Sequence, residues 1–145
     1  MGVEPDHVLV PLDGSPLAED ALEHALAVFD CRVTVLNVVT PLDADMAEGG
    51  ILGSDDGQEA GARERAERLV ERARERATVE GRTIETVVET GDPADVIVDY
   101  VERHDVDHVV MGSHSGKRGR ITRRLLGTVT TAVLGNVDVT VTVVQ

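Results

Sequence analysis

The chain has 145 residues and a formal charge of −13, with 27 Asp and Glu against 14 Lys and Arg. This length fits one domain with its own core, which must be aliphatic because Phe29 and Tyr100 are the only aromatic residues. The acidic charge and the lack of aromatic side chains that could stack on bases argue against a nucleic-acid-binding protein. No apolar run is long enough to span a membrane. The single cysteine, Cys31, cannot form an internal disulfide.

Strand and helix patterns alternate along the first part of the chain. The apolar run 7–11 predicts a buried strand. Ser15 and Pro16 are typical of the N-cap and first position of a helix, and an apolar stripe at helical spacing follows them. The β-branched run 32–39 predicts a second strand. Residues 40–59, rich in Gly and Asp, predict a mobile loop.

The second part of the chain continues the alternation. It predicts, in order, a charged helix at 60–77, a strand at 82–89, a helix that begins at Asp92 and Pro93, a strand at 108–111, a helix at 125–134 and a final strand at 137–144. Strands that alternate with helices are typical of a parallel sheet covered on both faces. We therefore predict one α/β domain over residues 1–145, with a doubly wound, five-stranded, mostly parallel sheet of the Rossmann-like type.

Positive charge is concentrated in one segment. Between His108 and Val137 the chain has no Asp or Glu, and it holds five basic residues: Lys117, Arg118, Arg120, Arg123 and Arg124. In an acidic chain, such a patch indicates an anion-binding site. The alternative is a solvated loop whose basic side chains pair with acids elsewhere in the fold.

Three loops are expected to meet where parallel strands end, which is where ligands bind in open sheets of this kind. Asp13 follows the first strand and could accept hydrogen bonds from ribose hydroxyls, or it could steady the turn. Val38 ends the second strand and could contact a purine, or it could belong to the core. Gly112 to Gly116 and then Gly127–Thr128 could bring backbone N–H groups close to a phosphate.

The order of these pieces resembles the universal stress protein family over nearly the whole chain. The motifs that carry the resemblance are VLVPLDGS, VLNVV, TGDPADVIVDYV, DHVVMGSHS and RRLLGTV. The resemblance implies an adenine nucleotide alpha-hydrolase-like fold and a cytoplasmic protein that binds ATP, with or without Mg²⁺, as a regulatory ligand. The implied binding residues are Pro11, Leu12, Asp13, Val38, Met111, Gly112, Ser113, Ser115, Gly116, Arg118, Gly127, Thr128 and Val129.

The glycine segment departs from the family pattern, in which Gly-x-x-Gly and nine further residues precede Gly-Ser or Gly-Thr. Here the segment from Gly112 to Gly127 is two residues longer, and Ser115 stands where the second glycine would fall. Gly116 or the amide of Ser115 would then contact the phosphates, and Arg118 could reach in from the longer loop. Altered glycine loops are also typical of family members that do not bind ATP.

No catalytic constellation or metal site is visible, because Ser15 has no predicted His and Asp partners and the histidines are scattered. The last strand, apolar on one face, is expected at a sheet edge, where it invites pairing with a second copy. The resemblance also implies a homodimer through this strand. The rival functions are a dimeric interaction module without nucleotide and a slow nucleotide hydrolase.

The compartment and solvent are also expectations. The N-terminal residues lack the charged and apolar regions of a signal peptide, which favours a cytoplasmic protein. An acidic surface with Lys117 as its single lysine would suit a halophilic, high-salt cytoplasm. A GC-rich genome would also favour arginine over lysine.

Overall fold

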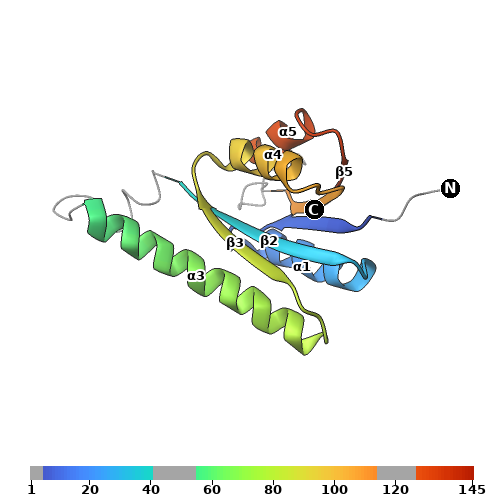
Figure 1. Ribbon diagram of the computed structural model, residues 1–145, viewed down its shortest axis with the longest axis horizontal. Helices are drawn as coiled ribbons and strands as arrows, with labels where there is room; N and C mark the ends of the chain where they lie inside the picture. Colours follow the sequence, from blue (N-terminus) through green and yellow to red (C-terminus); the bar gives the residue numbers. More distant parts are fainter. Residues whose placement is uncertain (1–4, 41–54, 114–126) are drawn as a thin grey trace, which may run out of the picture.

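The computed structural model describes residues 5–40, 55–113 and 127–145. Its elements are, in chain order, β1 (His7–Pro11), α1 (Pro16–Val28), β2 (Arg32–Val39), α3 (Asp55–Val79), β3 (Glu85–Thr90), α4 (Pro93–Arg103), β4 (His108–Gly112), α5 (Thr128–Leu134) and β5 (Thr140–Val144). The five strands form one sheet in the order β3-β2-β1-β4-β5, and all neighbouring pairs are parallel. The predicted fold class is confirmed (Figure 1).

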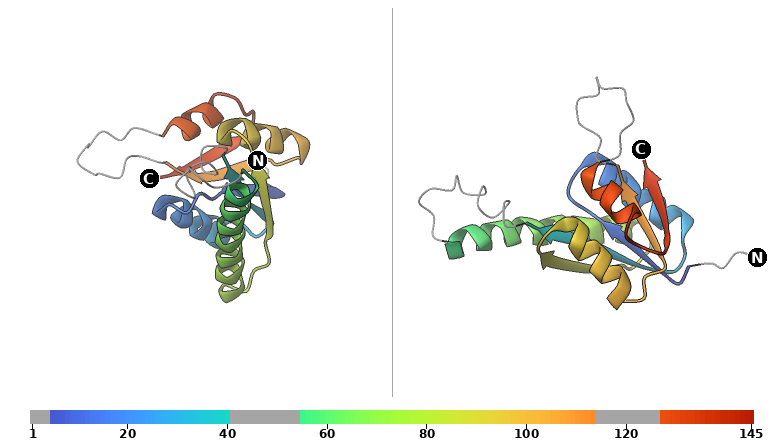
Figure 2. Two further views of the ribbon diagram at one scale, coloured as in Figure 1. Left: turned by 90° about the vertical axis from the view of Figure 1, so that its left-hand side faces the viewer. Right: turned by 90° about the horizontal axis from the view of Figure 1, so that it is seen from above.

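Helices cover both faces of the sheet, α1 and α3 on one face and α4 and α5 on the other (Figures 1 and 2). Successive strand residues point to opposite faces. Val8 and Val10 of β1 therefore pack with α1 and α3, while Leu9 packs with α4 and α5. Burial on both faces explains why the inner strands read as continuous apolar runs.

The two predicted helix starts are confirmed in atomic detail. The Ser15 hydroxyl accepts a hydrogen bond from the Ala18 N–H at 3.2 Å, and Pro16 follows it in the first turn. The Asp92 carboxylate accepts from the Asp95 N–H at 3.1 Å. These caps satisfy N–H groups that have no partner inside the helix.

Several predicted boundaries differ from the structure. The helix placed at 60–77 begins at Asp55, so the expected loop at 40–59 is helical in its last five residues; residues 41–54 lie outside the described part. Acidic residues favour a helix N-terminus, so Asp-rich composition did not exclude a helix. The last strand starts at Thr140 rather than at residue 137, because the Val137 N–H still bonds the Val133 carbonyl of α5.

The third strand is also shorter at its start than predicted, since it begins at Glu85 rather than at residue 82. Arg82 instead reaches across to the end of α1 and the connection that follows it, where its guanidinium donates to the carbonyl oxygens of Leu26, at 2.6 Å, and Cys31, at 3.2 Å. The helix predicted at 125–134 is described from Thr128 onward. In the part of the chain that is described, no helix combines the length and hydropathy needed to cross a membrane.

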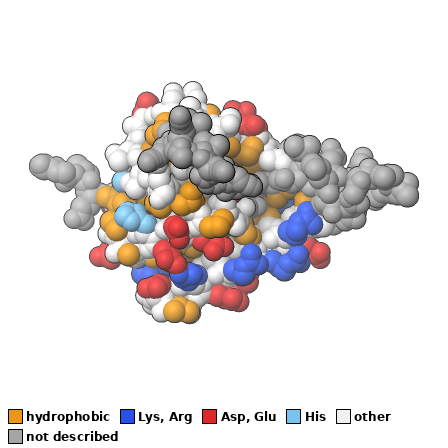
Figure 3. Space-filling model, turned by 180° about the vertical axis from the view of Figure 1, so that it is seen from behind, with side chains coloured by type: hydrophobic (Ala, Val, Ile, Leu, Met, Phe, Trp, Pro, Cys, Tyr) orange, Lys and Arg blue, Asp and Glu red, His pale blue; other side chains and the backbone are white. Residues whose placement is uncertain are grey.

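Acidic and basic side chains are mixed on the surface (Figure 3). Ion pairs join Arg32 to Glu85 at 2.9 Å and Arg103 to Asp99 at 3.3 Å. On α3, Arg76 pairs with Glu23 of α1 and Arg74 pairs with Glu71. Exposed pairs of this kind contribute little to stability, of the order of 0–1 kcal/mol each.

Candidate functional site

A cavity of about 340 Å³ opens where β1, β2 and β4 end. We call it the edge cavity; its lining residues are Pro11, Leu12, Asp13, Ser15, Ala18, Leu36, Val38, Thr40, Pro93, Ile97, Met111, Gly112, Val129 and Thr130. The direction in which strands are added to the sheet reverses between β1 and β4. After β1 the chain adds β2 and β3 on one side, and it then adds β4 and β5 on the other side. Ligands of doubly wound sheets bind at this position.

The structure brings together most of the residues that the sequence selected. Seven of them line the edge cavity: Pro11, Leu12, Asp13, Val38, Met111, Gly112 and Val129. Ser113 follows β4 and is buried. Gly127 caps the N-terminus of α5 and Thr128 is its first residue, but neither lines the cavity. Ser115, Gly116 and Arg118 lie outside the described residues.

The walls of the edge cavity are mainly apolar. Met111 and Ile97 are buried in the core on the α4 and α5 side, and half-buried Val38 packs against them. Beside them, the Asn37 side-chain amide donates to the Leu12 carbonyl at 2.7 Å. This buried bond ties together the ends of β1 and β2 and holds Val38 in place.

Asp13 has a structural partner and also faces the edge cavity. Its carboxylate Oδ1 accepts a hydrogen bond from the Ser15 N–H at 2.9 Å, the geometry of an Asx turn. Gly14 between them has a φ of +89°, a backbone conformation that favours glycine. Asp13 is exposed, and no described residue bonds its second carboxylate oxygen. Both interpretations drawn from the sequence are compatible with this geometry.

Gly112 has a packing role that the sequence did not reveal. A Cβ built on Gly112 would lie 2.6 Å from the backbone carbon and oxygen of Leu17 and 2.9 Å from the Ala18 nitrogen. The first turn of α1 therefore rests directly on the end of β4. On the other side, the Thr130 hydroxyl of α5 donates to the Gly112 carbonyl at 3.2 Å. The missing side chain of Gly112 thus lets α1 approach the end of β4, and the Gly112 carbonyl binds α5.

Sequence reasoning missed several lining residues of the edge cavity. They are Ser15, Ala18, Leu36, Thr40, Pro93, Ile97 and Thr130. The helix-start signals at Ser15 and Pro93 were read correctly, but the sequence does not say that both starts face the same strand ends. Among the described residues, no three His, Cys, Asp or Glu side chains are grouped closely enough to hold a metal ion.

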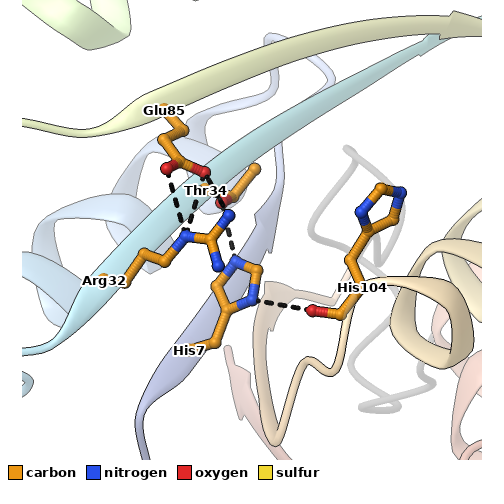
Figure 4. A network of polar contacts seen from close by, with 5 residues as sticks. All are labelled: His7, Arg32, Thr34, Glu85 and His104. Atoms are coloured by element: carbon orange, nitrogen blue, oxygen red, sulfur yellow. Dashed lines mark hydrogen bonds and ion pairs between the residues drawn. The ribbon is translucent and has the colours of Figure 1, made fainter.

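A second polar cluster lies at the opposite end of the strands (Figure 4). His7, at the start of β1, places Nδ1 3.1 Å from the His104 carbonyl oxygen and Nε2 2.8 Å from the Thr34 hydroxyl. That hydroxyl lies 3.1 Å from Glu85, which also pairs with Arg32. A carbonyl only accepts, so Nδ1 carries the proton in neutral His7. The Thr34 proton can then go to Nε2, whereas protonated His7 would turn it toward Glu85.

Burial lowers the pKa of His7 below its usual value of 6.5, and the Arg32 charge acts in the same direction. The His104 carbonyl, Glu85 and Asp107 oppose this shift. A depressed pKa means that the folded protein binds a proton less readily than the unfolded chain. His7 therefore contributes stability above about pH 6.5, and this contribution is lost as the pH falls through the folded-state pKa.

We expect the stability of the wild-type protein to fall between pH 7.5 and pH 5.5, and His7→Gln to reduce that fall. The reason is that glutamine does not titrate, although it will lower stability at pH 7.5. Urea unfolding at both pH values measures the effect. His24→Gln, a change at an exposed histidine, is the control. Its charge is the smallest cause of the low pKa of His108, so this variant should keep most of the wild-type fall. An equal pH dependence in wild type and His7→Gln would contradict this assignment. His108, whose pKa burial also lowers, supplies a residual dependence.

The universal stress protein family model matches residues 5–145. Universal stress protein MJ0531 of Methanocaldococcus jannaschii is 32% identical over 148 residues, covering 95% of this chain and 81% of that protein. Among solved structures, hypothetical protein MJ0577 superposes with a TM-score of 0.80 at 27% identity, covering 98% of this chain and 96% of its own.

Two further similar structures were solved with ligands. A universal stress protein family protein from Arabidopsis thaliana with AMP bound has a TM-score of 0.69 at 22% identity, over 97% of this chain and 91% of its own. A universal stress protein in complex with cAMP has a TM-score of 0.66 at 21% identity, over 99% and 98%. At these identities the likeness concerns the fold. With a family model spanning the described fold and a 32% identical relative, the chain belongs to the universal stress protein family.

Proposed function

We propose that this protein is a cytoplasmic regulator of the stress response that binds ATP in the edge cavity as a regulatory ligand. The observation that carries the proposal is that the edge cavity has mainly apolar walls and one carboxylate, that of Asp13, and lies between β1 and β4, where the strand order reverses. The AMP-bound and cAMP-bound relatives support an adenine nucleotide as the ligand class. The volume of about 340 Å³ falls within the usual range of small-molecule sites.

Each part of the nucleotide has a proposed set of contacts. Val38, Met111 and Pro11 would shape the purine pocket beside Leu12, and the Asp13 carboxylate would accept from the ribose hydroxyls. The phosphates would lie toward Gly112, Ser113 and the start of α5, at Gly127, Thr128 and Val129. Ser115, Gly116 and Arg118 remain phosphate candidates from the sequence and lie outside the described residues. Any Mg²⁺ would arrive with the nucleotide, bound through its phosphates.

Nucleotide analysis of the purified protein tests the proposal. With no Trp and one Tyr, the protein absorbs weakly, so a bound nucleotide would be visible as excess absorbance near 260 nm. We expect adenine nucleotide in the denatured extract, and saturable ATP binding by calorimetry, with and without Mg²⁺. Absence of both would contradict nucleotide binding and favour the second candidate function.

That second candidate is a dimeric interaction module of the same fold that binds no nucleotide. One observation favours it: the close packing of α1 on Gly112 explains this glycine without any phosphate. The longer glycine segment points the same way. Both candidates use the same dimer, which we propose forms through β5.

The edge position of β5 supports pairing with a second copy. β5 is the last strand of the sheet (Figure 1), and its valines are half-buried. The Val144 carbonyl accepts from the Ser113 N–H at 2.9 Å, so Val144 faces β4. Backbone groups of successive strand residues point alternately to the two sides, and the Val141 and Val143 N–H groups therefore point outward. These outward groups can pair with the same strand of a second molecule around a two-fold axis.

We expect the wild type to be a dimer by light scattering at micromolar concentration in high salt, and Val141→Pro to be a monomer or to aggregate. Proline removes an outward-facing N–H without removing a donor to β4. Val141→Ala keeps the N–H while shortening the side chain, and this control should remain dimeric. A wild-type mass of one chain would refute the proposed dimer.

A further inference from the structure

An open cavity of about 830 Å³ adjoins the edge cavity on the α3 side. We call it the arginine groove; its lining residues are Asp13, Asn37, Val38, Val39, Ala62, Arg65, Ala66, Arg68, Leu69 and Arg72. Asp13 and Val38 also line the edge cavity, so the two cavities meet at the ends of β1 and β2. Figure 3 shows basic side chains gathered on the side of the molecule where the N-terminal half of α3 lies.

The arginines of this groove differ from the other described arginines in their contacts. Arg32, Arg74, Arg76 and Arg103 are in ion pairs, and Arg82 donates to two carbonyl oxygens. Within residues 5–40, 55–113 and 127–145, the guanidinium groups of four arginines have no hydrogen-bond or ion-pair partner: Arg63, Arg65, Arg68 and Arg72. Three of these four line the groove.

The three groove arginines lie on the same face of α3 because of their spacing along the helix. Arg65, Arg68 and Arg72 follow one another at i, i+3 and i+7, which places them on one face of α3. Ala62, Ala66 and Leu69 form the apolar surface between them and the strands. Like charges at this spacing repel one another and destabilise a helix slightly. A bound anion would remove that repulsion.

The charge balance of the groove is opposite to that of the whole chain. The chain carries −13, whereas three guanidinium groups against Asp13 leave +2 among the described lining residues. Guanidinium groups bind phosphate through paired N–H donors, with more geometric specificity than an ammonium group. An open, positively charged groove over an apolar floor fits a phosphate group attached to, or beside, a larger molecule.

The geometry points to a second anion site, in which Arg65, Arg68 and Arg72 bind a phosphate group next to Asp13. Two sources share this chemistry: free inorganic pyrophosphate or polyphosphate, and a phosphate group on the ribose of a nucleotide in the edge cavity. The second source rests on the proposed function, because a ribose held by Asp13 would stand at the boundary of the two cavities. Arginines beside a ribose-binding carboxylate accommodate such an extra phosphate in dinucleotide-binding folds.

Calorimetry at constant ionic strength tests the site with inorganic pyrophosphate as the probe. We expect saturable binding to the wild type and at least tenfold weaker binding to Arg68→Gln. The matched control is Arg63→Gln, which removes the same charge from the same helix outside the groove and should stay within twofold of wild type. Circular dichroism checks that α3 remains folded in both variants, as expected for exposed side chains.

The two sources are separated by a second pair of titrations. If ribose phosphates occupy the groove, adenosine 3′,5′-bisphosphate will bind at least tenfold more tightly than AMP, and Arg68→Gln will abolish that gain. If free phosphates occupy it, pyrophosphate will bind equally well in the presence of saturating ATP. Either result supports the site. No pyrophosphate binding together with no gain from the second phosphate overturns it, as does an equal loss in Arg63→Gln and Arg68→Gln.

The same measurements keep this inference separate from the proposed function. ATP titration of Arg68→Gln, in which the groove has lost an arginine, reports on the edge cavity. Binding of ATP without any dependence of pyrophosphate or bisphosphate on Arg68 refutes the arginine groove and leaves the proposed function standing. Binding of pyrophosphate without binding of ATP refutes the proposed function and leaves the groove as an independent anion site.

Discussion

Gly112→Ala is expected to lower the free energy of unfolding by about 3 kcal/mol, at the upper end of the effects of overpacking. The added Cβ would lie 2.6 Å from backbone atoms of Leu17 and 2.9 Å from the Ala18 nitrogen. Backbone cannot rotate away as a side-chain tip can, so α1 would have to move off the end of β4. Urea unfolding measures the change.

Gly135→Ala is the matched control for this substitution. A Cβ on Gly135 would meet its nearest atom, the Thr131 carbonyl oxygen, at 3.7 Å, an ordinary contact, and its φ of −83° suits alanine. We expect its stability to stay within about 0.5 kcal/mol of wild type, as for other surface substitutions. If Gly112→Ala is as stable as Gly135→Ala, the close approach of α1 to β4 is wrong.

Asp13→Ala is expected to weaken ATP binding by about 10- to 100-fold. A hydrogen bond to a charged group contributes roughly 1.5–3 kcal/mol, and each 1.4 kcal/mol is a factor of ten in affinity. Calorimetry with ATP provides the measurement. Because Asp13 also accepts from the Ser15 N–H, thermal unfolding of the same variant must be measured in parallel.

Asp13→Asn separates the two roles of this residue. Asparagine retains an oxygen that can accept from the Ser15 N–H and so keeps the turn, but it has no charge for the ribose hydroxyls. We expect a Tm close to that of wild type and an ATP affinity between those of the wild type and Asp13→Ala. A lower Tm with unchanged affinity in Asp13→Ala would show that Asp13 acts only in the turn.

From the sequence, residues of the candidate site could be predicted only where they directly follow a predicted strand. Asp13 and Val38 were selected because each follows an apolar strand, and the structure places both in the edge cavity. Pro93 and Ile97 were read only as parts of a helix, because nothing local indicates that the start of α4 reaches the same edge. The four-residue chain from Arg32 to His7 was missed, since its members come from three strands.

The arginine groove could not be predicted from the sequence either. The sequence drew attention to the basic segment 117–124, where positive charge is free of acids. On α3 the arginines alternate with glutamates, so charge along the chain averages out and no patch is visible. Helical geometry separates the two signs, and the ends of β1 and β2 then supply the opposite wall.

By itself, the sequence determined the alternation of strands and helices, the caps at Ser15 and Asp92 and the parallel, two-sided burial of the sheet. These features depend on interactions between residues a few positions apart and on the alternation of apolar side chains, and both can be recognised in a short stretch of sequence. Only the tertiary structure decided which helix starts face the edge cavity, why Gly112 must lack a side chain, and which arginines share a groove. Those features depend on contacts between segments distant in the chain, whose positions are set by packing of the whole core.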